Sequence, residues 1–437
     1  MPDGSPISTS SPNVATLDGQ PAVVVGTIGG HIYALSLATG RPVPGWPAST
    51  DGVPIRSTPS VAALRPGSPD DTVFIGAGAP TKHDPTGAYE AFGPNGKLAW
   101  KVTVHDPGNP VPTGVAASLA VGDLQGSTDV VAPSMGQEEA AINARTGKML
   151  DGFPWFTSDS GFSTPALADL YGNGRTEIVE GGAQTAGLAN GVQYSNGGHI
   201  RVLASTGNAG TGSPSGGLVC EYNTTQEVDS SPDVGPFLGG GAVGIVSGTG
   251  TYWKGASGTD EVLALTAYCR LAWSDKLDAA TMSSPALVDL FGTGSLDVVE
   301  GTSNGHGGGT VYALDGATGR VLWQAPAPGE VIGGVVAAEL EKGQMDVVVV
   351  GTGGAEVLDG RDGRLVATLG RFVGFQNSAL VTRDPNGTVG ITVAGYDAHD
   401  VGTIVHYEVP GSGGALVDAA GSWPELHHGP QLNGWDG

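Results

Sequence analysis

Apolar residues in this chain gather in short runs that Gly, Pro, Asn, Asp and Ser separate. Some runs are apolar throughout, such as AVVVG (22–26), TVFIG (72–76), EIVEG (177–181) and DVVEG (297–301). Other segments alternate in character, such as HIYALSL (31–37) and TVYALDG (310–316). Short runs rich in Val, Ile, Leu and Tyr between turn-forming residues predict β-strands. The pattern therefore indicates an all-β fold made of many short strands.

A triplet of two small polar residues and a proline recurs along the chain. Its five clear copies are Ser10-Ser11-Pro12, Ser57-Thr58-Pro59, Ser163-Thr164-Pro165, Ser230-Ser231-Pro232 and Ser283-Ser284-Pro285. Pro12 and Pro59 are 47 residues apart, Pro232 and Pro285 are 53 apart, and Pro59 and Pro165 are separated by two such periods. Weaker copies begin near Thr113-Gly114-Val115, Gly333-Gly334-Val335 and Asn377-Ser378-Ala379, which makes eight units.

Each unit reads as four strands, and a period of about 50 residues with four strands is typical of a propeller blade. One blade cannot bury both of its faces, so the units predict one domain over residues 1–437. The sequence predicts an eight-bladed β-propeller of four-stranded antiparallel blades. The approximate blades are residues 11–50, 55–105, 112–158, 161–228, 229–280, 282–330, 331–372 and 374–437. A seven-bladed ring is the alternative if the last unit folds outside it.

Composition and charge narrow the classes of partner. The chain has 75 Gly, 30 Pro and only 14% charged residues, and its net charge is −24. A field of that sign repels phosphate backbones, so we expect no nucleic-acid partner. No run approaches the roughly 18 apolar residues of a membrane helix, so we expect no membrane insertion. The first residues, MPDGSPISTSS, also lack the basic and apolar segments of a signal peptide.

The repeats resemble two known propeller families. The half that reads PALVDLFGTGSLDVVEG (285–301) resembles the FG-GAP/VCBS repeat of integrin-type propellers. The half that reads TVYALDGATGRVLW (310–323) resembles the repeat of PQQ-like, quinoprotein-dehydrogenase-like propellers. The end of the chain, SWPELHHGPQLNG (422–434), is similar to a tail of bacterial secreted PQQ-like repeat proteins. The resemblance implies a secreted protein of actinobacterial type. We expect no PQQ cofactor, because no calcium-binding set of that family carries over and the cysteines are not adjacent.

Two turns resemble degenerate calcium loops of the FG-GAP type. The ligands they offer are Asp169, Asn173 and Glu177 in DLYGNGRTE, and Asp289, Thr293 and Asp297 in DLFGTGSLD. Calcium takes six to eight oxygen ligands around a sharp glycine turn, and each loop lacks an acid of the full pattern. The alternative is a metal-free turn in which the first Asp caps backbone N–H groups. Calcium is thus the one metal that the sequence suggests.

Cys220 and Cys269 lie 49 residues apart, near the fourth strands of consecutive units. This spacing places them on neighbouring blades, where they form either a disulfide or two free buried thiols. A disulfide is the prediction for a chain that looks secreted.

Long second-to-third strand connections offer a place for function. They occur at residues 77–87, 182–198, 249–260 and 302–309, and an antiparallel blade sends all of them to one face. The candidate ligand-binding residues on them are His83, Tyr194, Tyr252, Trp253, Lys254 and His306. Exposed aromatic rings beside Lys suit a sugar or another flat ligand. Alternatively, Trp253 packs over a blade edge.

Two functions follow from these patterns. The first is a monomeric, secreted binding scaffold that recognises a carbohydrate or a protein on the long-loop face. The second is a glycan-active lyase or hydrolase with its site at the channel mouth. No recognisable catalytic motif appears, which favours the first.

Overall fold

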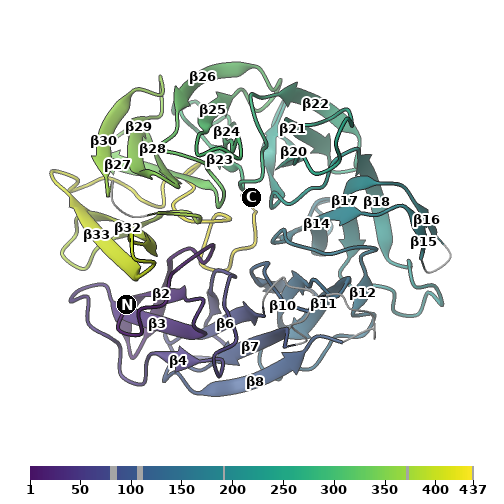
Figure 1. The fold of residues 1–437 in the computed structure, drawn as a ribbon, viewed down its shortest axis with the longest axis horizontal. Helices are drawn as coiled ribbons and strands as arrows, with labels where there is room; N and C mark the ends of the chain where they lie inside the picture. The colour runs from purple at the N-terminus through teal and green to yellow at the C-terminus, as the bar shows by residue number, and fades with distance from the viewer. Residues whose placement is uncertain (79–85, 106–111, 190–191, 371–373, 436–437) are drawn as a thin grey trace.

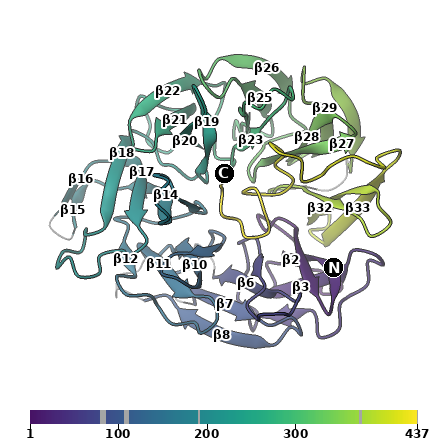
Figure 2. The same cartoon turned by 180° about the vertical axis from the view of Figure 1, so that it is seen from behind.

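A computed structural model describes residues 1–78, 86–105, 112–189, 192–370 and 374–435 of the chain. The sheets are arranged as eight blades around a central channel, as Figure 1 and Figure 2 show from opposite sides. The all-β, eight-bladed prediction is confirmed. None of the described segments forms a helix long and apolar enough to cross a membrane.

The first four blades occupy the N-terminal half of the chain. Blade 1 contains β1 (Asn13–Leu17), β2 (Gln20–Gly26), β3 (His31–Ser36) and β4 (Ala48–Ser49). Blade 2 contains β5 (Ser60–Ala62), β6 (Thr72–Ala77), β7 (Ala88–Phe92) and β8 (Leu98–Thr103). Blade 3 contains β9 (Ala120–Asp123), β10 (Thr128–Pro133), β11 (Glu138–Asn143) and β12 (Trp155–Phe156). Blade 4 contains β13 (Ala166–Ala168), β14 (Glu177–Gln184), β17 (Gly197–Ala204) and β18 (Leu218–Thr224), with a separate hairpin of β15 (Gly187–Ala189) and β16 (Val192–Tyr194).

The last four blades follow the same order. Blade 5 contains β19 (Asp233–Leu238), β20 (Ala242–Gly248), β21 (Glu261–Thr266) and β22 (Leu271–Lys276). Blade 6 contains β23 (Ala286–Val288), β24 (Asp297–Gly301), β25 (Thr310–Leu314) and β26 (Val321–Pro326). Blade 7 contains β27 (Val335–Glu341), β28 (Gln344–Gly351), β29 (Gly354–Asp359) and β30 (Leu365–Leu369). Blade 8 has three strands, β31 (Leu380–Arg383), β32 (Val389–Tyr396) and β33 (Gly402–Val409).

The recurring triplets join the inner strands to each other. Their first hydroxyl bonds the glycine that closes the second strand of the same blade: Ser57 Oγ donates to Gly76 O at 2.9 Å and accepts from Gly76 N at 2.8 Å. Their second hydroxyl accepts from the backbone of the preceding blade, as Thr58 Oγ1 does from Ser11 N at 2.9 Å. The repeat therefore encodes ring closure, because each copy links two blades.

Tryptophans join the outer strands. At five blade boundaries an indole N–H donates to a backbone carbonyl of the next blade, from Trp46, Trp100, Trp155, Trp273 and Trp323. In blade 6, Trp323 donates to Gly360 O at 2.8 Å, and a Cβ on Gly363 would lie 2.6 Å from its ring. The glycine of the A-T-G-R-like turn thus leaves room for the neighbouring indole. It also adopts positive φ (72°), which glycine tolerates.

The C-terminal tail, residues 421–435, fills the channel. Figure 1 and Figure 2 both place the end of the chain at the centre of the ring. Tail carbonyls accept hydrogen bonds from the inner strands, at Asp289, Ala337, Val381, Val61, Val121, Leu167 and Val234, and Pro430 O also accepts one from the Asn13 side chain. The tail therefore touches all eight blades and closes the channel from within.

Candidate functional site: the axial pocket

A pocket of about 350 Å³ lies on the ring axis. Its wall includes one residue from every blade: Thr9, Arg56, Ala116, Phe162, Asp229, Met282, Ile332 and Gln376. Seven of them directly precede a triplet, and Ala116 directly precedes Ala117-Ser118-Leu119, which takes the place of the triplet in blade 3. We call these eight residues the mouth ring. Leu426 of the tail also lines the pocket. Since the tail binds the inner strands further along their length, we infer that it forms the floor of the pocket.

The mouth ring lies on the long-loop face. The second-to-third strand connections bond the segments that lead into the inner strand of the same blade, as Gly250 N does with Glu227 O at 3.0 Å and Ser303 N with Ala280 O at 2.9 Å. The same segments carry the mouth ring. The loops and the pocket mouth therefore share a face.

Apolar side chains form part of this mouth. Phe162 is 37% exposed and Met282 is 36% exposed, although both are large and hydrophobic. Ile332 follows Met282 around the ring. Exposed apolar groups at the edge of a concave pocket are typical of a binding surface.

Arg56 supplies the positive charge of the pocket. Its guanidinium contacts Ser8 Oγ at 3.4 Å, and Ser8 Oγ in turn donates to Gln376 Oε1 at 2.8 Å. Its Nε is buried and has no hydrogen-bond partner among the described residues. An unpaired buried donor costs free energy, and an acceptor on a ligand would satisfy it if the guanidinium turned toward the pocket.

Asp229 supplies a titratable carboxyl. Burial, together with the charges of Glu227 and Asp159, raises the pKa of Asp229 to about 7. A carboxyl with this pKa beside a cleft is typical of a functional site.

None of the predicted ligand-binding residues that the structure describes lines this pocket. Tyr252 and Trp253 contact each other, with ring centroids 4.9 Å apart and planes at 90°. Tyr252 is 72% exposed, whereas the Trp253 indole donates to Gly197 O of blade 4 at 3.2 Å. Tyr252 N bonds Glu227 Oε1 at 3.0 Å, so this loop sits beside the segment that carries Asp229.

The other predicted residues are scattered. Tyr194 lies on β16, with the Arg201 guanidinium carbon 5.9 Å from its ring centroid. Lys254 and His306 are exposed on separate loops, and His306 N bonds Asn304 Oδ1 at 2.8 Å. His83 lies outside the described residues. Sequence reasoning missed the mouth ring, although seven of its eight residues directly precede a triplet.

In the calcium-like turns the first Asp binds backbone N–H groups. Asp169 accepts from Asn173 N at 2.9 Å and Gly174 N at 2.6 Å, and these bonds lower the pKa of Asp169. Its partner Glu177 accepts from Leu170 N at 3.1 Å. This geometry is that of the metal-free alternative.

The second turn has the same arrangement. Asp289 accepts from Thr293 N at 2.9 Å and Gly294 N at 2.7 Å. Burial, with the charges of Asp315 and Asp289, raises the pKa of Asp297 to about 7. Within the described ranges, no three His, Cys, Asp or Glu side chains are grouped so that they could hold a metal ion. Calcium binding stays a prediction.

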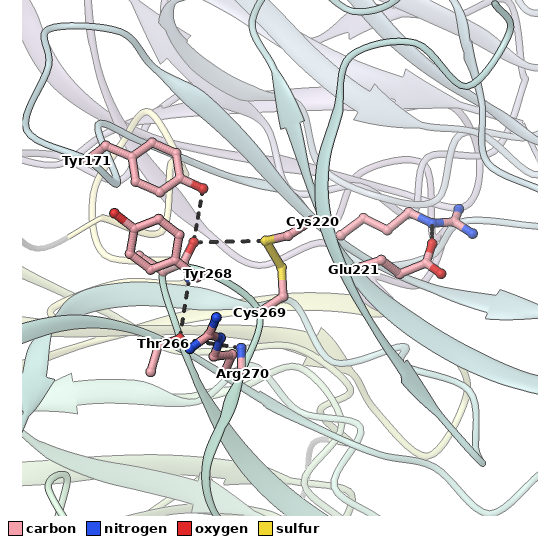
Figure 3. Close-up of a disulfide and its surroundings, with 9 residues drawn as sticks. Tyr171, Cys220, Glu221, Thr266, Tyr268, Cys269 and Arg270 are labelled. Atoms are coloured by element: carbon pink, nitrogen blue, oxygen red, sulfur yellow. Dashed lines mark hydrogen bonds and ion pairs between the residues drawn. A yellow bond between two sulfur atoms is a disulfide. The ribbon is translucent and has the colours of Figure 1, made fainter.

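The predicted disulfide is confirmed. Cys220 of β18 and Cys269 of the β21–β22 turn are bonded, and they join blades 4 and 5 (Figure 3). Tyr171, the residue that replaces an acid in the first calcium-like turn, donates to Ala267 O at 3.0 Å and lies 5.2 Å from the Tyr268 ring. Its aromatic ring therefore serves the contact between these blades.

Pyrroloquinoline quinone is the cofactor that a PQQ-like propeller suggests. It is a planar polycarboxylate, whereas the axial pocket is lined by one basic residue, Arg56, and by the acidic Asp229. The disulfide joins an outer strand to an outer turn rather than lining the axis. The residues of this pocket do not fit the cofactor.

Comparison with known proteins supports the fold. A family model for PQQ-like repeats (PQQ_2), described as outer membrane protein assembly factor BamB, matches residues 212–391. No curated protein matches the chain. The sequence therefore has PQQ-like repeats in a segment that spans less than half of its length.

Many solved structures have a similar fold, and three of them are the following. BamB from Moraxella catarrhalis is 14% identical, with a TM-score of 0.55, over 90% of this chain and 92% of that chain. Sqt1 from Saccharomyces cerevisiae is 11% identical, with a TM-score of 0.61, over 93% and 97%. The quinohemoprotein alcohol dehydrogenase ADHIIG from Pseudomonas putida HK5 is 12% identical, with a TM-score of 0.57, over 93% and 75%. At these identities the likeness shows a shared propeller fold, with PQQ-like repeats in this chain.

Proposed function

We propose that this chain is an extracellular binding scaffold that takes an apolar, acceptor-bearing part of a protein ligand into the axial pocket. The observation that carries the proposal is the mouth ring, where exposed Phe162 and Met282 share one 350 Å³ pocket with the unpaired donor of Arg56. Hot spots of protein interfaces combine buried apolar anchors with a few charged partners in this way. The disulfide is compatible with an extracellular setting.

One feature favours a protein ligand, and another favours binding over catalysis. The description of the matching family, an outer membrane protein assembly factor, suggests work on other proteins. Glycan-cleaving enzymes commonly use two carboxyl groups, and Asp229 is the one acidic residue among the residues that line the pocket. This favours binding over catalysis. A carbohydrate is the alternative ligand, and the 72% exposed Tyr252 ring supports it.

A binding screen with matched variants tests the proposal. The purified chain is screened against extracellular proteins and soluble polysaccharides, and each hit is measured with Phe162→Ser and Met282→Ser. Each change should weaken binding at least about tenfold, the size expected for an anchor residue. Val366→Ser is the control, since Val366 is 49% exposed on β30, away from the pocket. Equal binding by all variants would contradict the axial site.

A glycan-active enzyme is the second candidate, and Asp229 favours it. A carboxyl with a pKa of about 7 can act as a general acid or base at neutral pH. Product release from a polysaccharide, lost in Asp229→Asn, would establish this function in place of binding alone.

A further inference from the structure

A cavity of about 550 Å³ lies between blades 8 and 1, away from the axial pocket. It is lined by the third-to-fourth strand turn of blade 1 (residues 36–40), the β31–β32 turn (384–386), and Ile404, His406 and Glu408 of β33. Asp384 and Thr392 hold the His406 ring, at 2.9 Å from Nε2 and 2.9 Å from Nδ1. We call this cavity the rim groove.

The rim groove lies where the other blades place their fourth strand. Among the described residues, β33 pairs only with β32, and its other edge is without a strand. The N-terminal amine of Met1 reaches Gly402 O, so the open part of the edge runs from Thr403 to Val409. An unpaired edge presents N–H and C=O groups that an extended chain can pair with.

Among the described residues, no tryptophan indole packs against the glycine of the third-to-fourth strand turn in blade 1, although one does so in other blades. Gly147, Gly319 and Gly363 close such turns, and a Cβ on them would lie 2.8, 2.5 and 2.6 Å from Trp100, Trp273 and Trp323. Gly40 closes the same kind of turn, SLATGR, with φ of +65°, yet a Cβ on it would have nothing within 4 Å. The space beside Gly40 that corresponds to the indole site of those other turns is therefore unoccupied.

The carbonyl that would accept the indole N–H is also in place. Trp273 donates to Gly316 O, which lies three residues before Gly319. The corresponding carbonyl in blade 1 belongs to Leu37, three residues before Gly40, and Leu37 lines the rim groove. In blade 6, Ala313 of the third strand pairs with Trp323 of the fourth. His406 of β33 is at the position in blade 8 that is equivalent to Ala313.

Charge indicates which segment suits the groove. Asp384 and Glu408 line it. In the chain's own fourth strands a basic residue precedes the tryptophan by three positions, in KLAW (97–100), RLAW (270–273) and RVLW (320–323). A segment of this pattern would bring a cation close to the acidic groove.

We propose that the rim groove binds an extended segment of a partner protein, with a basic residue three positions before a tryptophan. The segment pairs with β33 as the missing fourth strand of blade 8, and its indole covers Gly40. This site is on another part of the ring than the axial pocket, so it goes beyond the function proposed above.

A synthetic peptide with the β26 sequence, RVLWQAPA, tests the proposal on the full chain. Fluorescence polarisation of the labelled peptide should show saturable binding, and the same peptide with alanine for tryptophan should bind at least about tenfold more weakly. Gly40→Asn should also weaken binding at least about tenfold, because Asn tolerates positive φ and places a side chain where the indole would lie. Gly126→Asn is the matched control, an exposed turn glycine with φ of +83° and nothing within 4 Å, and should bind like the parent.

Three outcomes would overturn the proposal. They are no binding at millimolar peptide, equal binding of the alanine peptide, and equal binding by Gly40→Asn. Sedimentation velocity shows whether the segment that binds the groove belongs to a second copy of this chain. Self-association of the parent that Gly40→Asn abolishes would mean that the ligand is another copy rather than a different protein. Circular dichroism of both variants shows that they are folded.

Discussion

Cys220 and Cys269, whose Cα atoms are 5.8 Å apart, take the places of a tryptophan and a glycine at the other blade boundaries. Cys220 pairs with Val202 just before a bulge, as Trp323 pairs with Ala313. Cys269 has φ of +55°, close to the positive φ of Gly319 in the next blade's turn. A covalent bond thus replaces the indole contact between blades 4 and 5.

Removing the disulfide should destabilise the ring. Cys220→Ser with Cys269→Gly should lower the free energy of unfolding by about 2–4 kcal/mol, the usual range for a bridge that closes a loop of this length. Cys220→Trp with Cys269→Gly should recover part of the loss, because it rebuilds the contact of the other blades. Thermal unfolding of the three proteins measures this. A tryptophan variant no more stable than the serine variant would refute the equivalence.

His427 anchors the tail in the channel. Its Nδ1 lies 2.6 Å from Asp233 Oδ1 and its Nε2 lies 3.1 Å from Pro165 O, and the side chains of His427 and Asp233 are both fully buried. His427→Ala leaves the Asp233 carboxylate without its partner, so we expect a loss of about 3–5 kcal/mol in urea unfolding. His399→Ala, at a side chain 86% exposed, should change the stability little. Similar losses in both would argue against the anchor.

Stability should fall as the pH rises from about 4 to about 8. Burial raises the pKa of Glu300 to about 8 and that of Asp297 to about 7. Over this range the folded chain keeps protons that the unfolded chain has released, so folding is favoured at the acidic end. Melting temperatures at pH 5 and pH 8 check the trend, and Glu300→Gln should reduce the difference. A higher melting temperature at pH 8 would be opposite to the expected sign.

Chelation should leave the melting temperature unchanged. The carboxylates of Asp169 and Asp289 are satisfied by backbone N–H groups, as a metal-free turn requires. A ligand that binds the folded state would raise the melting temperature. Calorimetry with EDTA and with excess calcium compares the two alternatives, and a rise with calcium would identify these turns as metal sites.

The repeat was sufficient to predict the blades, because Ser57 and Thr58 carry the bonds that close the ring and therefore recur. The mouth ring could not be predicted from the repeat, because its residues differ from blade to blade. Arg56 and Phe162, for example, are at equivalent positions but differ in charge and polarity. The role of the tail could not be read either, since the channel that receives His427 exists only once all blades are closed. Trp253 was predicted to bind a ligand because it lies on a long loop, but its indole N–H donates to the backbone of blade 4.

The C-terminal tail crosses the channel and forms the floor of the axial pocket. Hydrogen exchange of the full chain, followed by mass spectrometry, tests this most directly. Hydrogen exchange reports amide N–H groups, and in the tail Trp423 N donates to Ala337 O, Leu432 N to Gly429 O and Gly434 N to His427 O. These tail amides should therefore exchange as slowly as the buried strands β24 and β28. Complete exchange of the tail at the earliest times, with the sheets still protected, would contradict a closed channel and remove the floor of the axial pocket.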